Sequence, residues 1–141
     1  MFSTVAVGTD GSATAAEAVT QAAELARRLD AKLVLLSAFR DSRSAPSGAG
    51  DDIELQWASN SSARVRTVLE RTAAELGKSG LDCQMRVDEG DPAEVLTRLA
   101  EECGADLLVI GNKGMNRRVL GSVAKAVTQK AGCSVLVVKT T

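Results

Sequence analysis

The sequence of 141 residues contains no histidine and no tyrosine. Without histidine, the chain cannot form a Ser-His-Asp or Cys-His catalytic unit, a histidine-ligated metal site or a histidine pH switch. No apolar run approaches the roughly 18 residues of a transmembrane helix, and residues 1–10 lack the basic and long apolar regions of a signal peptide. We therefore expect a cytoplasmic protein with no membrane partner.

An excess of charge of one sign is also missing. Lys and Arg number 17 and Asp and Glu number 18, which gives a net charge of −1. This balance offers no electrostatic basis for binding nucleic acid or an anionic membrane. The apolar share of 45% and the charged share of 25% are typical of a globular protein. A chain of this length predicts one domain, spanning residues 1–141.

The three cysteines do not form a recognisable framework. Cys83, Cys103 and Cys133 are odd in number, lie far apart and include no CxxC pair. This usage is typical of reduced thiols that pack inside a cytosolic protein, and not of a disulfide-bonded scaffold. A redox role for one of them is the alternative.

Short apolar runs alternate with amphipathic segments along the chain. A continuous run such as Leu33–Leu36 is typical of a strand covered on both faces, and alternating strands and helices predict an open parallel sheet between two helical layers. The expected strands are 4–7, 32–39, 81–87, 106–110 and 134–139. The expected helices are 13–29, 53–76, 92–103 and 122–131, and residues 41–52, rich in Ser, Gly and Ala, are the expected mobile loop.

The clearest local signal is the segment Gly90-Asp91-Pro92-Ala93-Glu94. Asp91 can cap a helix, Pro92 suits its first position, and Glu94 is placed to close a capping box. Ser12 is likewise expected to cap the helix that follows it.

Two strand exits carry unusual residues, namely Gly8–Ser12 and Gly111–Ser122. Open parallel sheets bind ligands beyond the C-terminal ends of their strands, where the winding direction reverses. If strands 4–7 and 106–110 are neighbours, both loops line one crevice. In the first loop, Asp10 offers a carboxylate that could hold a ribose or base donor, or help to ligate a metal ion bound to phosphates.

The second loop has the composition of a phosphate cradle. Glycines at positions 111 and 114 allow the backbone to turn with positive φ and to approach a ligand closely. Gly121-Ser122 opens a helix whose free N–H groups and positive dipole end favour an anion. Three cations add positive charge nearby: Lys113, Arg117 and Arg118.

Structural explanations for the same residues stay open. The glycines could simply form turns, and Ser122 could be only an N-cap. Asp10 could be only an Asx-turn residue, and Arg117 and Arg118 could be solvated surface charges. The pattern is neither a GxxxxGK[ST] P-loop nor a GxGxxG fingerprint. The residues alone therefore indicate a nucleotide- or phosphate-binding protein without defining its class.

The chain resembles the universal stress protein family over essentially its whole length. The resemblance is carried by five segments: Val5–Ser12, Gly90–Glu94, Ala105–Gly111, Gly111–Gly114 with Gly121–Val123, and Cys133–Val138. It implies an adenine-nucleotide α-hydrolase-like sheet with strand order 3-2-1-4-5. It also implies ATP binding, in the branch that carries the pattern G-x2-G-x9-G-[ST].

The resemblance further implies which residues meet the nucleotide. Thr9 and Asp10 would contact it from the first strand. The backbone of Ala38 would meet adenine, and Gly111 would lie near the ribose. The phosphates would be surrounded by Lys113, Gly114, Gly121, Ser122 and Val123. The full set of candidate binding residues is Gly8, Thr9, Asp10, Ala38, Ile110, Gly111, Lys113, Gly114, Arg117, Arg118, Gly121, Ser122 and Val123.

The sequence departs from the family pattern in one place. Six residues separate Gly114 from Gly121, where the family motif has nine. A shorter loop has less backbone to wrap a triphosphate, although Arg117 and Arg118 could compensate. ATP is the expected ligand, while ADP, AMP and cyclic AMP remain open. Mg²⁺ could accompany the phosphates beside Asp10, and the protein alone is expected to form no metal site.

The last strand poses an edge problem. In the implied order it lies at the sheet edge, yet it is apolar: Val135, Leu136, Val137 and Val138. An exposed apolar edge invites pairing, and a two-fold axis could pair the strand with its copy. The resemblance implies the same homodimer. The alternative is that a helix or residues 139–141 cover the strand.

Three functions of different classes fit these observations. The first is a regulatory stress-response module that binds an adenine nucleotide. The second is an enzyme such as a slow ATPase, although the chain lacks histidine and Asp10 is the one carboxylate in the two loops. The third is an interaction module that binds no nucleotide or prefers cyclic AMP. We expect the first, with no catalytic residue and with negligible turnover.

Overall fold

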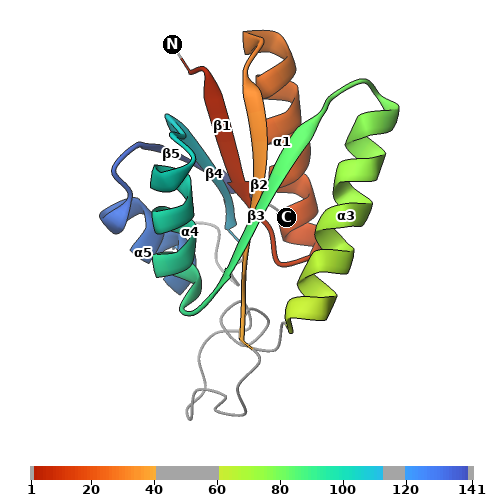
Figure 1. Ribbon diagram of the computed structural model, residues 1–141. Helices are drawn as coiled ribbons and strands as arrows, with labels where there is room; N and C mark the ends of the chain where they lie inside the picture. The colour runs from red at the N-terminus through yellow and green to blue at the C-terminus, as the bar shows by residue number, and fades with distance from the viewer. Residues whose placement is uncertain (1, 41–60, 113–119, 140–141) are drawn as a thin grey trace.

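The computed structural model describes residues 2–40, 61–112 and 120–139, and within these ranges five strands alternate with helices (Figure 1). The elements are β1 (Thr4–Gly8), α1 (Ala13–Leu29), β2 (Lys32–Phe39), α3 (Ser62–Lys78), β3 (Cys83–Glu89), α4 (Pro92–Glu102), β4 (Leu107–Asn112), α5 (Ser122–Lys130) and β5 (Ser134–Lys139). No helix in these ranges combines the length and the hydropathy that a membrane crossing requires.

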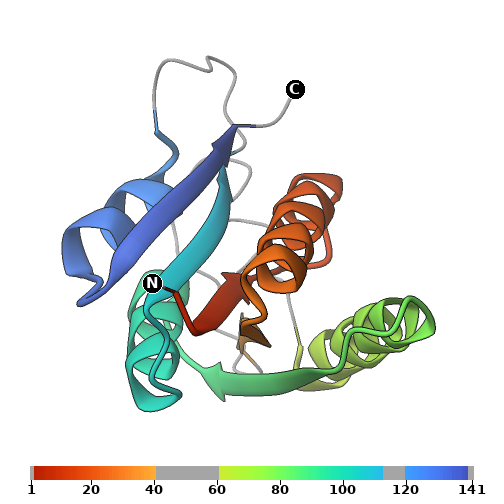
Figure 2. The same cartoon turned by 90° about the horizontal axis from the view of Figure 1, so that it is seen from above.

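The strands form one parallel sheet in the order β3-β2-β1-β4-β5. The predicted α/β class and the strand order implied by the resemblance are both confirmed. Val5 of β1 lies beside Leu33 of β2 on one side and Leu107 of β4 on the other. The winding direction therefore reverses between β1 and β4. Helices α1 and α3 cover one face of the sheet, and α4 and α5 cover the other (Figure 2).

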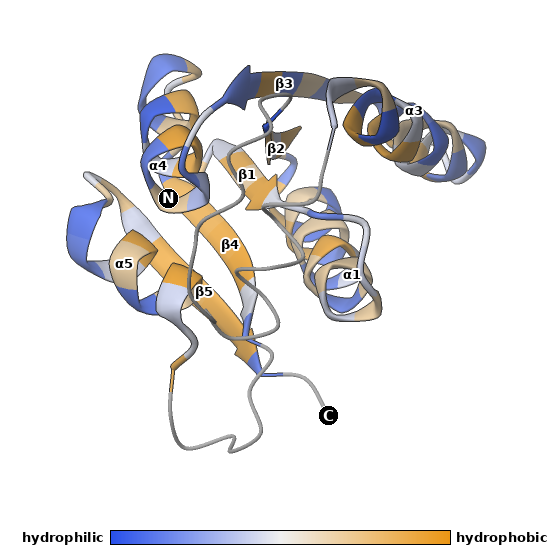
Figure 3. Ribbon diagram, turned by 90° about the horizontal axis from the view of Figure 1, so that it is seen from below, coloured by the Kyte–Doolittle hydropathy of each residue, from blue (hydrophilic) through white to orange (hydrophobic). Residues whose placement is uncertain are grey.

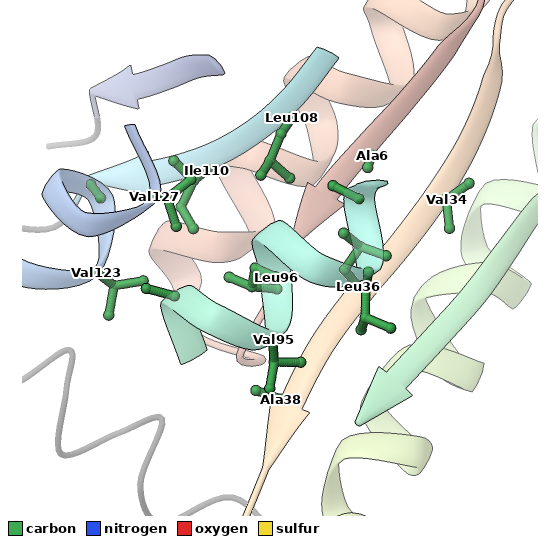
Figure 4. Close-up of a cluster of buried hydrophobic side chains, with 14 residues drawn as sticks. Ala6, Val34, Leu36, Ala38, Val95, Leu96, Leu108, Ile110, Val123 and Val127 are labelled. Atoms are coloured by element: carbon green, nitrogen blue, oxygen red, sulfur yellow. The ribbon is translucent and has the colours of Figure 1, made fainter. Parts of the chain in front are cut away.

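The central strands supply two cores, because successive side chains of a strand point to opposite faces. In β1, Val5 and Val7 pack beneath α1 and α3, whereas Ala6 packs on the side of α4 and α5, and all three are fully buried. Figure 4 shows this second core, where Leu96 of α4 and Val127 of α5 meet the sheet. Burial on both faces explains why these strands are continuously apolar in sequence.

The two edge strands differ in polarity. β3 is mostly exposed, as predicted for this strand, although it runs from Cys83 rather than Leu81. Figure 3 shows hydrophilic stretches on β3, whereas β1, β4 and β5 are largely hydrophobic. β5 forms the opposite edge. There the Leu136 side chain is 37% exposed and the three valines are half-buried, so the predicted apolar edge is present.

The long helix predicted from residue 53 begins later than expected. Ser61 has an extended backbone, with φ −86° and ψ 161°, and its hydroxyl accepts the Arg64 N–H. Ser61 is therefore the N-cap of α3, and a continuous helix from 53 to 76 is wrong. The apolar stripe of Val65 and Leu69 is buried as predicted. Residues 53–60 and the loop expected over 41–52 lie outside the described residues.

Of the two hydrogen bonds in the predicted capping box of α4, only the one accepted by Asp91 is present. The Asp91 carboxylate accepts the Glu94 N–H at 3.2 Å, and Pro92 occupies the first helical position. The Glu94 side chain does not return the bond. It lies 3.5 Å from the Lys130 ammonium of α5 instead, so the expected capping box is replaced by an ion pair between two helices.

Asp106 fastens the start of β4 to the start of β1. Its carboxylate accepts the N–H groups of Ser3 and Thr4, at 2.9 Å and 3.1 Å, and the Ser3 hydroxyl. Led by the Ser3 amide, these bonds hold the pKa of Asp106 below its usual value. A lowered pKa in the folded state contributes stability above the unfolded pKa, and this contribution is lost as the pH falls through the folded value.

We therefore expect Asp106→Asn to lower the free energy of unfolding by a constant amount between about pH 5 and pH 8, with the difference from wild type shrinking below about pH 4. Urea unfolding of both proteins across this range measures the difference, and the other carboxylates cancel in the comparison. A difference that stays unchanged down to about pH 3 would contradict this role for the carboxylate.

Candidate functional site

Two hydrogen bonds to β2 fix the residue that follows β1, Thr9. The Thr9 N–H donates to the Leu36 carbonyl at 2.9 Å, which continues the β1–β2 ladder one residue past the strand. The buried Ser37 hydroxyl donates to the Thr9 carbonyl at 2.6 Å. Thr9 is itself buried. These two bonds fix the backbone of the β1–α1 loop at the carboxyl edge of the sheet.

Asp10 is a buried carboxylate at the centre of this loop, with 5% of the residue exposed. One of its oxygens, Oδ1, accepts the Ser12 N–H at 2.9 Å, so the Asx-turn that the sequence left open is present. Within the described ranges, no group donates a hydrogen bond to the second oxygen, Oδ2. The structural role therefore occupies one oxygen and leaves the other available to a ligand.

The turn leads directly into α1. Gly11 has a φ of +84°, a conformation that favours glycine, and its N–H donates to the Thr9 hydroxyl at 3.2 Å. The Ser12 hydroxyl accepts the Ala15 N–H at 3.1 Å, which confirms Ser12 as the predicted N-cap. The sequence Gly8–Ser12 thus folds as one compact strand-to-helix turn.

The exit of β4 lies against the start of α1. A Cβ atom at Gly111 would lie 3.0 Å from the carbonyl oxygen of Thr14 and 3.0 Å from its Cγ2 atom. Gly111 belongs to β4 and is not among the positive-φ residues, so the expected positive-φ turn at this position is wrong. Glycine is needed here for the close approach of α1. The contact places the end of β4 against the first turn of α1, directly after the β1–α1 loop.

Asn112 connects the end of β4 to the start of α5. Only 2% of the residue is exposed, and its Oδ1 accepts the Gly121 N–H at 2.8 Å. Gly121 is the N-cap and Ser122 is the first helical residue, so the alternative of Ser122 as an N-cap is wrong. The first N–H groups of α5 are therefore anchored beside the β4 exit.

Four of the predicted site residues could offer a ligand only their backbone groups. Ala38 and Ile110 on the sheet and Val123 on α5 are buried in the core that the sheet forms with α4 and α5 (Figure 4). A Cβ atom at Gly8 would lie 3.0 Å from Leu96 Cδ1, so this glycine makes room for α4. A ligand at the carboxyl edge of the sheet could reach these positions only through N–H and C=O groups. The remaining predicted residues lie outside the described part of the chain: Lys113, Gly114, Arg117 and Arg118.

Sequence reasoning missed two buried polar side chains, Ser37 and Asn112. Ser37 sits inside an apolar strand and Asn112 follows Gly111 in the loop motif, so both were visible as polar residues next to apolar runs. A buried polar group needs a hydrogen-bond partner, and this requirement was the available signal. Their partners, Thr9 and Gly121, could not be identified from sequence spacing.

The cysteines are free and half-buried, in agreement with the prediction of packing thiols. Burial raises the pKa of the Cys83 thiol and of the Cys133 thiol, which keeps both protonated near neutral pH. Within the described residues, no group of three Cys, Asp or Glu side chains is placed to hold a metal ion.

These features define a class of protein. An open parallel sheet has its reversal point between β1 and β4. A buried carboxylate, Asp10, follows β1, and the end of β4 lies against α1 and is bonded to the N-cap of α5. This is the ligand-binding arrangement of doubly wound α/β proteins. The chain belongs to the universal stress protein family, whose sequence model matches residues 1–139.

Individual relatives agree with this assignment. The universal stress protein Rv1636 of Mycobacterium tuberculosis is 35% identical over 144 residues, covering 99% of this chain and 98% of its own. A solved structure of a universal stress protein in complex with cAMP is 32% identical, with a TM-score of 0.73 and 99% of each chain covered. Universal stress protein UspA from Lactobacillus plantarum is 26% identical, with a TM-score of 0.74, covering 96% of this chain and 97% of its own.

Proposed function

We propose that this protein is a cytoplasmic regulatory module that binds an adenine nucleotide, with ATP the first candidate, in the crevice between the β1 and β4 exits. The observation that carries the proposal is the Oδ2 atom of Asp10. A buried carboxylate oxygen without a donor is costly, and a ribose hydroxyl or a base amino group would satisfy it. The solved relative with bound cAMP, at 32% identity, supports an adenine nucleotide as the ligand.

The opposite end of the crevice suits phosphate. The Gly121 N–H is occupied by Asn112, and the next N–H groups, of Ser122 and Val123, belong to the first turn of α5. Such groups and the positive end of the helix dipole favour an anion. The sequence between β4 and α5 contains the cations Lys113, Arg117 and Arg118. Nucleoside and phosphates would therefore be held by different loops.

Cyclic AMP is the second candidate ligand. The related structure with cAMP favours it, and so does the loop between Gly114 and Gly121, which is shorter than the family motif. A cyclic monophosphate needs less backbone around it than a triphosphate does. The adenosine half of the site would be the same for both ligands.

We propose a regulatory rather than a catalytic role. Hydrolysis of ATP needs an oriented water and a general base in addition to a grip on the phosphates. The chain has no histidine, and the one carboxylate of the two loops, Asp10, is assigned here to holding the nucleoside. If Mg²⁺ accompanies the ligand, the residues described here offer it one carboxylate, Asp10, so the phosphates would supply most of its coordination.

Isothermal titration of the purified protein with ATP, cyclic AMP and GTP tests the proposal. We expect saturable binding of at least one adenine nucleotide and at least tenfold weaker binding of GTP. Native mass spectrometry should show adenine nucleotide that co-purifies, and chromatography of the ligand after incubation should show negligible conversion. Absence of binding by every adenine nucleotide would reject the proposal, and rapid conversion of ATP would favour the enzyme.

We also propose that the protein forms a homodimer through β5. The strand is an edge of the sheet, its Leu136 side chain is 37% exposed, and Val135, Val137 and Val138 are half-buried. An uncovered edge of this kind favours pairing with a copy of itself. The tail beyond Lys139, which could cover the strand instead, lies outside the described residues.

Leu136→Lys is expected to weaken the dimer by at least tenfold, because it places a charge in the paired edge. Analytical ultracentrifugation over a range of concentrations measures the shift. Met85→Lys is the matched control, since Met85 is a 44% exposed residue on β3, the opposite edge. Equal effects of the two substitutions, or a dimer that tolerates Leu136→Lys, would contradict pairing through β5.

A further inference from the structure

We propose that Asn112 is a positioning residue that sets the affinity of the site for phosphate groups and leaves its affinity for the nucleoside unchanged. The proposal rests on the proposed function of the crevice. It starts from one hydrogen bond, from the Gly121 N–H to Asn112 Oδ1, with a length of 2.8 Å. The bond joins two residues that are nine positions apart, at the end of β4 and at the N-cap of α5.

The acceptor of this bond, Asn112 at the end of β4, is held in place by its neighbours. Asn112 pairs in register with Lys139 of β5, and the preceding Gly111 is packed against the Thr14 carbonyl of α1. With 2% of the residue exposed, Asn112 is enclosed by the protein. Its side-chain oxygen is therefore a stationary acceptor at the carboxyl edge of the sheet.

The helix end of the bond depends on this acceptor. Gly121 has no side chain, so the N-cap position cannot cap its own helix, and α5 spans only nine residues. Short helices need tertiary contacts to define their position. The Val123 and Val127 side chains hold α5 to the core, and the Asn112 bond fixes where its first turn begins. Loss of the acceptor would release that turn and leave a donor without a partner.

This arrangement separates the two halves of the crevice. Asn112 orients the N–H groups of Ser122 and Val123, which would face phosphate, whereas Asp10 and the end of β2 would face the nucleoside. Ser37 plays the corresponding part for the nucleoside half, because its hydroxyl donates to the Thr9 carbonyl at 2.6 Å. A small displacement of the α5 N-terminus should weaken only the phosphate contacts, and a small displacement of the β1–α1 loop should weaken only the nucleoside contacts.

The test compares adenosine and ATP as ligands of the wild type, Asn112→Ala and Ser37→Ala, by titration calorimetry. We expect Asn112→Ala to weaken ATP binding by about tenfold and to change adenosine binding by less than about twofold. Ser37→Ala should weaken both ligands by a similar factor. A wild type that binds neither ligand would overturn the proposed function itself. Equal losses for ATP and adenosine in Asn112→Ala, or no loss for ATP, would overturn the positioning role alone.

Two further measurements keep the proposal testable if Asn112→Ala does not fold. Asn112→Ser keeps a polar group at the end of β4 but is too short to reach the Gly121 N–H, so the same selective loss for ATP is expected. In the ligand-free wild type, hydrogen exchange followed by NMR should show a protected Gly121 amide. An amide that exchanges as fast as in an unstructured peptide would exclude the bond on which the proposal depends.

Discussion

Asp10→Ala is expected to weaken adenine-nucleotide binding by roughly tenfold to a hundredfold, because a hydrogen bond to a charged group contributes about 1.5–3 kcal/mol. Only 5% of the Asp10 residue is exposed, and its Oδ2 atom has no donor among the residues that the structure describes. A ligand hydroxyl or amino group would supply that donor. Titration with ATP and with cyclic AMP measures the loss.

Two control substitutions distinguish a loss of ligand binding from a disruption of the Asx-turn. Asp10→Asn keeps one oxygen, which the Ser12 N–H can occupy, so the fold should be retained while the ligand still loses its acceptor. Asp82→Ala removes an exposed carboxylate just before β3, at the opposite end of the strands, and should leave binding unchanged. If Asp10→Asn binds ATP as the wild type does, the second oxygen has no role in recognition.

Gly111→Ala is expected to lower the free energy of unfolding by about 1–3 kcal/mol, the usual effect of overpacking a tight contact. The added methyl group would lie 3.0 Å from the Thr14 carbonyl oxygen, a backbone atom that cannot rotate away as a side chain can. Relief of the contact requires α1 to move, and α1 begins directly after Asp10 and Ser12. Nucleotide affinity should therefore fall together with stability.

Gly77→Ala is the matched control for this substitution. Gly77 lies near the end of α3, has no atom within 4 Å of an added Cβ, and does not have a positive φ. The same change should stabilise the protein here by about 0.5–1 kcal/mol, because alanine is the better helix former. Thermal and urea unfolding of both variants give the comparison. A neutral Gly111→Ala would mean that the β4 exit and α1 are not tightly packed.

The fold could be predicted from the sequence because strands buried on both faces are continuously apolar. The run Leu33–Leu36 and the alternation of strands with helices were sufficient for a parallel sheet, and Ser12 and Asp91 marked two helix starts through their capping chemistry. The start of α3 was missed because Ser61 is followed by no large apolar residue until Val65, so its capping signal competed with the helical pattern of the preceding residues.

The site was harder to predict, because its geometry depends on contacts between distant segments. The Asx-turn of Asp10 is local and was among the alternatives. The role of Gly111 was assigned to its own backbone conformation, whereas the structure assigns it to the approach of Thr14, almost one hundred positions earlier in the chain. The bond from Gly121 to Asn112 likewise depends on where α5 packs, which no local pattern encodes.

The pairing of β1 with β4 also determines when the nascent chain can fold. Thr4 and Asp106 are in contact although 102 positions separate them, and the proposed crevice needs α5 as well. A ribosome must therefore release nearly the whole chain before the crevice exists, and closing so long a loop slows folding. A nucleotide bound at the proposed site would stabilise only the finished protein, so ligand supply would influence its lifetime rather than its maturation.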